Sequence, residues 1–188
     1  MSEASRLLCV RLKSADVNWL PTYAGKTREQ VLRDAAWACT FNREVVLVPI
    51  PGSTSAPRGV WPAERLAVSL CGIGLGRSVW PAIRRCVAVR KSATALNADR
   101  PSVQQHYESF SVLKELRPPE RMVLVDDVIT KGRTIFAAAC RLYDSFPNAD
   151  IQAFALVRTM GLLPRVAHFL EPCHGVVKWG GGDARREP

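Results

Sequence analysis

The stretch Arg121–Phe136, with the sequence RMVLVDDVITKGRTIF, constrains the fold of this chain more than any other. It begins as a continuous apolar run, which is typical of a strand buried on both faces of a sheet. Two adjacent carboxylates, Asp126 and Asp127, follow that run, and a short loop containing Gly132 leads into a helical pattern that starts at Thr134. Because ligands of open α/β sheets gather at the carboxyl ends of the strands, this segment predicts a binding site.

The loop after the two aspartates has the composition of an anion site. Gly132 permits a tight turn, and N–H groups at a helix N-terminus favour a negative charge. Thr130 and Thr134 add hydroxyl donors, while Asp126 and Asp127 offer acceptors for a vicinal diol or ligands for Mg²⁺. The pattern matches neither the Walker loop nor the three-glycine dinucleotide fingerprint. It favours a ribose 5-phosphate, and the plainer alternative, a turn that caps a helix, stays open.

The sequence VLVDDVITKGRT resembles the binding motif for 5-phosphoribosyl-1-pyrophosphate (PRPP) in type I phosphoribosyltransferases. That motif has four apolar, two acidic and two apolar residues, then threonine, a small residue, glycine, any residue and threonine. The resemblance implies that Asp126 and Asp127 face the ribose hydroxyls and hold Mg²⁺ as the cofactor. Lys131 departs from the motif, in which a small residue is usual. The residues that the resemblance assigns to the 5-phosphate are Val128, Ile129, Thr130, Lys131, Gly132, Arg133 and Thr134.

A second segment resembles the same family. Arg90 and Lys91 follow the apolar run Cys86–Val89, where many type I enzymes carry an Arg-Lys pair before a flexible loop that closes over the substrates. The polar, aperiodic stretch Ser92–Gln105 follows at once, and we expect it to be such a lid. The resemblance therefore assigns pyrophosphate binding and catalysis to Arg90 and Lys91, together with the two aspartates.

A third resemblance lies in Val46–Ala67, where a strand pattern runs into Pro-Ile-Pro-Gly-Ser. Type I enzymes have a pyrophosphate loop at this position. The order Arg-Gly-Val-Trp-Pro-Ala and then Leu-Ala is closest to the ComF-type, competence-associated branch. Trp61-Pro62 replaces the Asn-Gln pair of that branch, and the chain shows no cysteine-paired zinc module. The residues assigned to pyrophosphate here are Pro51, Gly52, Ser53 and Arg58.

Strand and helix patterns alternate along the chain. Buried strands are predicted over Val45–Pro49, Cys86–Val89, Met122–Val125 and Ile151–Val157. Helices are predicted over Thr27–Thr40, Pro62–Cys71 and Thr134–Phe146, the last with Phe136, Ala139, Cys140 and Tyr143 on its apolar face. This alternation predicts an α/β domain with an open, mostly parallel sheet flanked by helices, as in the type I phosphoribosyltransferase fold.

We expect a single domain over residues 1–188, with its core at about 45–157 and a small hood from 1–44, 158–188 or both. We expect the tail Gly180–Pro188 to be frayed.

The cysteines and histidines give no sign of a metal site. No two of the cysteines have the close spacing of a zinc pair, so we expect no zinc and read them as buried thiols in a reducing compartment. The histidines are scattered too, and we expect structural roles for them. The residues concerned are Cys9, Cys39, Cys71, Cys86, Cys140 and Cys173, and His106, His168 and His174.

Charge narrows the class of partner. The net charge of +9 and pI of about 9.7 suit a polyanion, either nucleic acid or a small phosphorylated substrate. Nucleic acid is left without a supporting motif, because basic and aromatic residues do not interleave. No apolar run is long enough to span a bilayer and no secretory leader is visible, so we expect a cytoplasmic protein without a membrane partner. We also expect a homodimer.

These patterns together predict a Mg²⁺- and PRPP-dependent transferase, in which a nucleobase or other nitrogenous acceptor displaces pyrophosphate. Thr130 stands where the transferases for 6-oxopurines generally carry an aspartate, so the resemblance implies an acceptor other than hypoxanthine or guanine. The alternative from another class is a non-catalytic PRPP or nucleotide sensor, or a DNA-uptake or DNA-repair accessory on the same fold.

Overall fold

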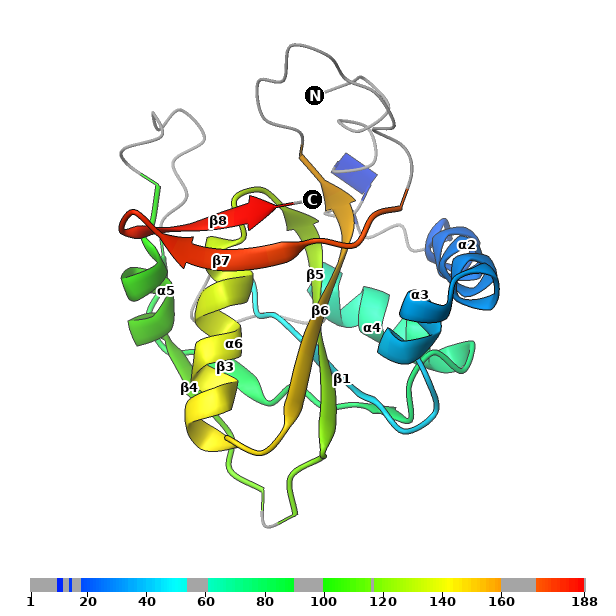
Figure 1. Ribbon diagram of the computed structural model, residues 1–188, viewed down its shortest axis with the longest axis horizontal. Coiled ribbons are helices and arrows are strands. Elements are labelled where there is room, and N and C mark those ends of the chain that lie inside the picture. The colour runs from blue at the N-terminus through cyan, green and yellow to red at the C-terminus, as the bar shows by residue number, and fades with distance from the viewer. Residues whose placement is uncertain are drawn as a thin grey trace.

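Figure 1 shows the fold as a computed structural model, which describes residues 10–11, 14, 18–53, 61–89, 100–115, 117–159 and 172–187. At its centre is a four-stranded parallel sheet of order β2-β1-β5-β6. Its strands are β1 (Val46–Pro49), β2 (Ser78–Val79), β5 (Arg121–Ile129) and β6 (Asp150–Arg158). The main helices are α2 (Leu20–Arg33), α3 (Ala35–Thr40), α4 (Pro62–Gly72), α5 (Val103–Ser109) and α6 (Arg133–Ser145). None of the described helices is long and apolar enough to cross a membrane.

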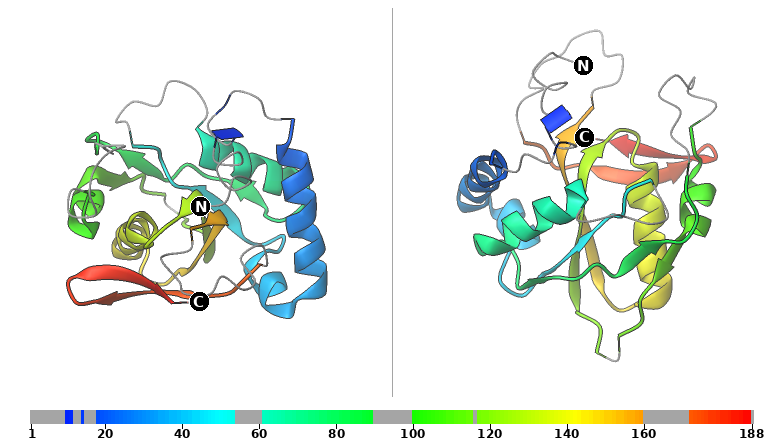
Figure 2. Two further views of the ribbon diagram at one scale, coloured as in Figure 1. Left: turned by 90° about the horizontal axis from the view of Figure 1, so that it is seen from above. Right: turned by 180° about the vertical axis from the view of Figure 1, so that it is seen from behind.

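The central strands bury side chains on both faces of the sheet. Leu47 of β1 and Val123 of β5 belong to an apolar layer shared with α2 and α4. Their neighbours Val46 and Met122 belong to the opposite layer, shared with α5 and α6. All four side chains are at most 3% exposed, and each contributes about 2 kcal/mol through burial. The helices lie on either side of the sheet in both views of Figure 2, so the predicted α/β class with a parallel, helix-flanked sheet is confirmed.

Three of the four predicted strands are confirmed, and Cys86–Val89 is wrong. The nearby strand is β3 (Ile83–Arg85), which pairs antiparallel with β4 (Phe110–Val112) outside the central sheet. The fourth place in the central sheet belongs to the short β2. Apolar composition misled here because Val87 is 63% exposed, whereas the charged Arg85 is buried.

The predicted helix Thr27–Thr40 is two helices, α2 and α3. Asp34 separates them, because its backbone is extended and its carboxylate accepts a hydrogen bond from the Ala36 N–H at 2.9 Å. Thr27 is not an N-cap, since it lies buried within α2 and its hydroxyl donates to the Tyr23 carbonyl at 3.0 Å. The predicted helix Pro62–Cys71 is confirmed as α4.

The predicted loop Ser92–Gln105 ends earlier than expected. Ser102 caps α5, and its side chain and that of Gln105 bond reciprocally with the backbone in a capping box. Tyr107, expected to lead into a strand, lies in this helix. Residues 90–99 lie outside the described part of the chain.

The prediction that the tail Gly180–Pro188 is frayed is wrong for its residues as far as Glu187. Residues Val176–Gly180 form β7 and Asp183–Glu187 form β8, an antiparallel hairpin. Gly181 and Gly182 join them with φ of 61° and 77°, the left-handed backbone that tight hairpin turns require. This hairpin crosses the N-terminal part of α6 (Figure 1).

The helix at Thr134–Phe146 is confirmed as α6, but its predicted apolar face is wrong. The buried side chains include Ile135, Ala138 and Leu142, whereas Tyr143 is 58% exposed.

The reading of the cysteines as buried is also wrong for those described. Apolar neighbours in sequence lie on other sides of a helix, so they do not decide whether a given cysteine faces the core. Cys39, Cys86 and Cys173 are exposed, and Cys71 and Cys140 are half-buried.

Candidate functional site

The predicted phosphate loop lies where β5 meets α6. β5 pairs with β6 as far as Ile129, so the strand continues past the two aspartates and the connecting loop is 130–132. α6 begins at Arg133, and Gly132 is its N-cap with φ of 87°. The strand is longer and the loop shorter than predicted, but the loop stands at the carboxyl end of a central strand and at the N-terminus of a 13-residue helix.

Asp126 and Asp127 are half-buried residues of β5, just before this loop. The Asp127 N–H donates to the Asp126 carboxylate at 2.9 Å. Strand alternation directs the two side chains to opposite faces of the sheet. No three His, Cys, Asp or Glu side chains among the described residues are arranged to hold a metal ion. Mg²⁺ commonly takes one or two protein carboxylates and completes its shell with water and substrate phosphates, so one carboxylate of the two is enough to hold Mg²⁺.

Arg85 is a buried cation beside this pair. Only 4% of it is exposed, its Nη1 donates to the Ser109 hydroxyl at 2.6 Å, and its guanidinium lies 4.3 Å from the Phe110 ring centroid. Its Nε donates to the Gly52 carbonyl at 2.5 Å. Burial lowers the pKa of Arg85 to about 10, although the negative charge of Asp126 acts to raise it. Arg85 is therefore a cation at neutral pH, and it holds the turn that follows β1.

That turn, residues 51–53, lies at the same end of the sheet as loop 130–132. β1 and β5 are parallel neighbours, and the Ile50 N–H donates to the Val125 carbonyl at 2.9 Å. The Ser53 carbonyl accepts from the Val89 N–H at 3.0 Å, so the residue before the predicted Arg-Lys pair lies against the turn. The predicted site residues outside the described part of the chain are Arg58, Arg90 and Lys91.

An ion pair joins the C-terminal hairpin to loop 130–132 and the start of α6. The Asp183 carboxylate accepts from Nε and Nη2 of Arg133 at 2.6 Å each, and Lys131 Nζ lies 3.4 Å from the same carboxylate. Arg133 Nη1 also donates to the carbonyls of Arg100 and Pro101 at 3.1 and 3.2 Å. Arg133 thus joins three segments far apart in sequence. We call this group of contacts the Arg133 clamp.

The clamp predicts how stability depends on pH. The hydrogen bonds from Arg133 lower the pKa of Asp183 to about 2 from its ordinary value of 3.8. The ion pair therefore stabilises the fold fully when the pH is above the unfolded-state pKa of Asp183. This stabilisation is lost as the pH falls through the folded-state pKa. We expect Asp183→Asn to lower the free energy of unfolding by about 1.5 kcal/mol at neutral pH. Urea titrations should show this difference shrinking below about pH 4, and a difference independent of pH would contradict the assignment.

Val177 of β7 covers Gly132 closely. A Cβ on Gly132 would lie 2.8 Å from Cγ1 and 2.9 Å from Cγ2 of Val177. Trp179, from the same strand, stacks on Phe136 with ring centroids 6.0 Å apart. The loop therefore requires glycine both for its left-handed backbone and for the approach of the hairpin.

Replacing that glycine tests both requirements. Gly132→Ala should lower the free energy of unfolding by about 1–3 kcal/mol, from the left-handed backbone and the collision with Val177. Adding Val177→Ala should recover only the collision part, and Val177→Ala alone is the control. Denaturant melts of the three variants give these values. Unchanged stability in Gly132→Ala would show that the loop does not hold this shape.

His106 borders the same loop from α5. It is 4% exposed, its ring stacks on Phe110 with centroids 6.3 Å apart, and its Nε2 lies 3.5 Å from the Thr134 hydroxyl. The His106 side chain thus lies against the first turn of α6.

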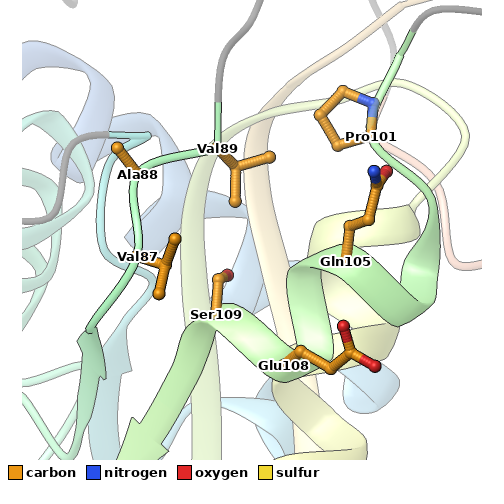
Figure 3. Close-up of a pocket in the computed structure, with 7 residues that line it drawn as sticks. All are labelled: Val87, Ala88, Val89, Pro101, Gln105, Glu108 and Ser109. Carbon is orange, nitrogen blue, oxygen red and sulfur yellow. The ribbon is translucent and has the colours of Figure 1, made fainter.

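A cavity of about 400 Å³ lies between residues 87–89 and α5, as Figure 3 shows. It is lined by Val87, Ala88, Val89, Pro101, Gln105, Glu108 and Ser109. None of the loop 130–132 residues or the two aspartates lines it. The cavity adjoins the predicted site, because the Val89 N–H donates to the Ser53 carbonyl and the Pro101 carbonyl accepts from Arg133.

Three residues of this neighbourhood escaped the sequence reasoning. Arg85 was not among the predicted site residues, and its place in the stretch IRRC is the only sign of burial in the sequence. Asp183 lay in a tail read as frayed. His106 was one of three scattered histidines for which only a structural role was expected. No protein-family model matches this chain, and no curated protein matches it significantly.

Proposed function

We propose that this chain binds PRPP and transfers its ribose 5-phosphate to a nitrogenous acceptor, with release of pyrophosphate. The observation that carries the proposal is the arrangement at the carboxyl ends of β5 and β1. Asp126 and Asp127 lie near the end of β5, and loop 130–132 and the N-terminus of α6 follow them in the chain. Turn 51–53 follows β1, the parallel neighbour of β5. A sugar that bears a phosphate at one end and a pyrophosphate at the other matches this order of groups.

The 5-phosphate end of the site is loop 130–132 with the first turn of α6. The positive φ of Gly132 turns the backbone, and the helix N-terminus supplies N–H donors and about half a positive charge. The hydroxyls of Thr130 and Thr134 add further donors. The guanidinium of Arg133 is engaged by Asp183, so this residue contributes its N–H to the phosphate while its side chain holds the loop.

The ribose lies at Asp126 and Asp127 in this proposal. A carboxylate accepts hydrogen bonds from the two ring hydroxyls, and one of the two would hold Mg²⁺, which would neutralise charge on the pyrophosphate as it leaves. Turn 51–53 faces the pyrophosphate, with Arg58, Arg90 and Lys91 assigned to the same group by the family resemblance. Arg85 acts through Gly52 and is a positioning residue for that turn. Catalysis would consist mainly of positioning and charge neutralisation.

Pyrophosphate release from PRPP and Mg²⁺ tests the proposal with a panel of bases. We expect release with at least one base and none with hypoxanthine or guanine, because the Thr130 hydroxyl cannot accept a purine N7 proton at neutral pH. Efficient turnover of either 6-oxopurine would contradict that acceptor assignment. PRPP binding without turnover of any base would replace the transferase by a sensor or accessory.

A further inference from the structure

A second hollow lies at the opposite end of the central sheet. It has a volume of about 550 Å³ and opens at the C-terminal end of α4. Arg43 precedes β1 and Arg77 precedes β2, so both stand at the amino ends of these parallel strands. Loop 130–132 follows the carboxyl end of β5, a parallel neighbour of β1, so the hollow is remote from the phosphate site. Its lining consists of Arg28, Arg43, Cys71, Gly72, Ile73, Gly74, Gly76 and Arg77.

The side chains around this hollow carry charge of one sign. Arg28 of α2, Arg43 and Arg77 are exposed, and none of the lining residues in the described part of the chain is acidic. Within the described ranges, none of these three guanidinium groups forms an ion pair or a side-chain hydrogen bond. Arg85, Arg133 and Arg141, in contrast, all donate to specific acceptors. The three arginines of the hollow are free to bind a ligand.

The plainer explanation is that the arginines balance the C-terminus of α4. A helix end carries about half a negative charge, and that charge is felt only within the last turn. It can offset only a fraction of three full positive charges, so the hollow keeps a net charge of more than two. Concentrating like charges around one hollow raises the free energy of the folded chain, and an anionic ligand would relieve it.

We propose that this hollow binds clustered phosphate groups, as found in a nucleic-acid backbone or a free polyphosphate. The guanidinium fork matches phosphate oxygens in bidentate geometry. Gly72 and Gly74 leave open space where a side chain would stand, so a ligand can approach the backbone there. The described lining residues offer no aromatic ring on which a base could stack, so the proposed recognition rests on the phosphates. This site is independent of the one at Asp126.

The test compares two triple variants that lose the same net charge. Arg28→Gln, Arg43→Gln and Arg77→Gln empty the hollow of its cations. Arg33→Gln, Lys114→Gln and Arg117→Gln remove three exposed cations elsewhere and are the matched control. Affinities for inorganic tripolyphosphate and for a short single-stranded thymine oligonucleotide are measured by fluorescence competition over a range of salt. Thermal melts confirm that both variants fold.

We expect the hollow variant to lose at least about tenfold in tripolyphosphate affinity at low ionic strength, and the control to lose less than about twofold. If a nucleic-acid backbone is the source, the oligonucleotide binds as well, and its log–log salt slope falls by about 2 in the hollow variant. Tripolyphosphate binding without oligonucleotide binding assigns the hollow to a free polyphosphate. Equal losses in both triple variants, or no binding of either ligand to the unaltered chain, would overturn the proposal.

Discussion

Asp126→Asn combined with Asp127→Asn should abolish most PRPP binding while leaving the fold intact. A hydrogen bond from a ribose hydroxyl to a charged carboxylate is worth about 1.5–3 kcal/mol, so losing two such bonds should cost at least about 3 kcal/mol, or ~100-fold in affinity. Both side chains are half-buried at a strand end and outside the apolar layers, so unfolding curves should change little. Calorimetric titration with PRPP and Mg²⁺ measures the loss.

Glu115→Gln with Glu120→Gln is the matched control, because it removes two exposed carboxylates that precede β5. It should leave PRPP affinity within about twofold of the unaltered chain, as expected for weak, screened surface charges. Equal affinity in the aspartate variant and in this control would refute the assignment of the ribose to Asp126 and Asp127.

Arg85→Gln should lower both stability and pyrophosphate affinity. The substitution removes the donors to Gly52 and Ser109 and the cation above Phe110 from a position that is 4% exposed. Breaking such a buried, charged hydrogen-bond network costs about 3 kcal/mol in the free energy of unfolding. Turn 51–53 loses its anchor, so pyrophosphate affinity should fall beyond what the loss of stability explains. Urea unfolding and pyrophosphate titration of the folded variant separate the two effects.

Arg84→Gln offers a control one residue away. Arg84 belongs to the same strand β3, carries the same charge and is exposed. Its substitution should change neither quantity by more than about 0.5 kcal/mol, which is usual for surface positions. Pyrophosphate affinity that is unaffected in Arg85→Gln would show that Arg85 stabilises the fold without positioning turn 51–53.

Strands β1 and β5 were predictable because their side chains are apolar on both faces, whereas the two-residue strand β2 was not. Val46 and Leu47, or Met122 and Val123, are successive residues buried in opposite layers, and only a covered sheet accommodates such runs. The run Cys86–Val89 has the same composition but lies outside any strand. Composition alone does not distinguish a strand from an apolar segment that is half exposed.

The position of loop 130–132 was predictable as a local pattern, whereas the contacts that support the loop were not. Gly132 and the two aspartates lie within a few residues of each other, so their spacing is visible in the sequence. Asp183 and Arg133 are separated by 50 positions, and Arg85 and Gly52 by 33. Such pairs depend on how the helices and strands pack, and no local pattern in the sequence indicates them. The hairpin at Gly181 was missed because a run of glycines was taken for disorder, although two left-handed residues make a tight turn.

Calorimetric titration of the unaltered chain with PRPP, in the presence and absence of Mg²⁺, tests the proposed PRPP site most directly. Ribose 5-phosphate and pyrophosphate are titrated separately for comparison. The account predicts saturable PRPP binding that weakens when Mg²⁺ is withheld. It also predicts weaker binding of each fragment, because the phosphate loop holds one end of PRPP and turn 51–53 the other. No binding of PRPP in the presence of Mg²⁺ would contradict the account.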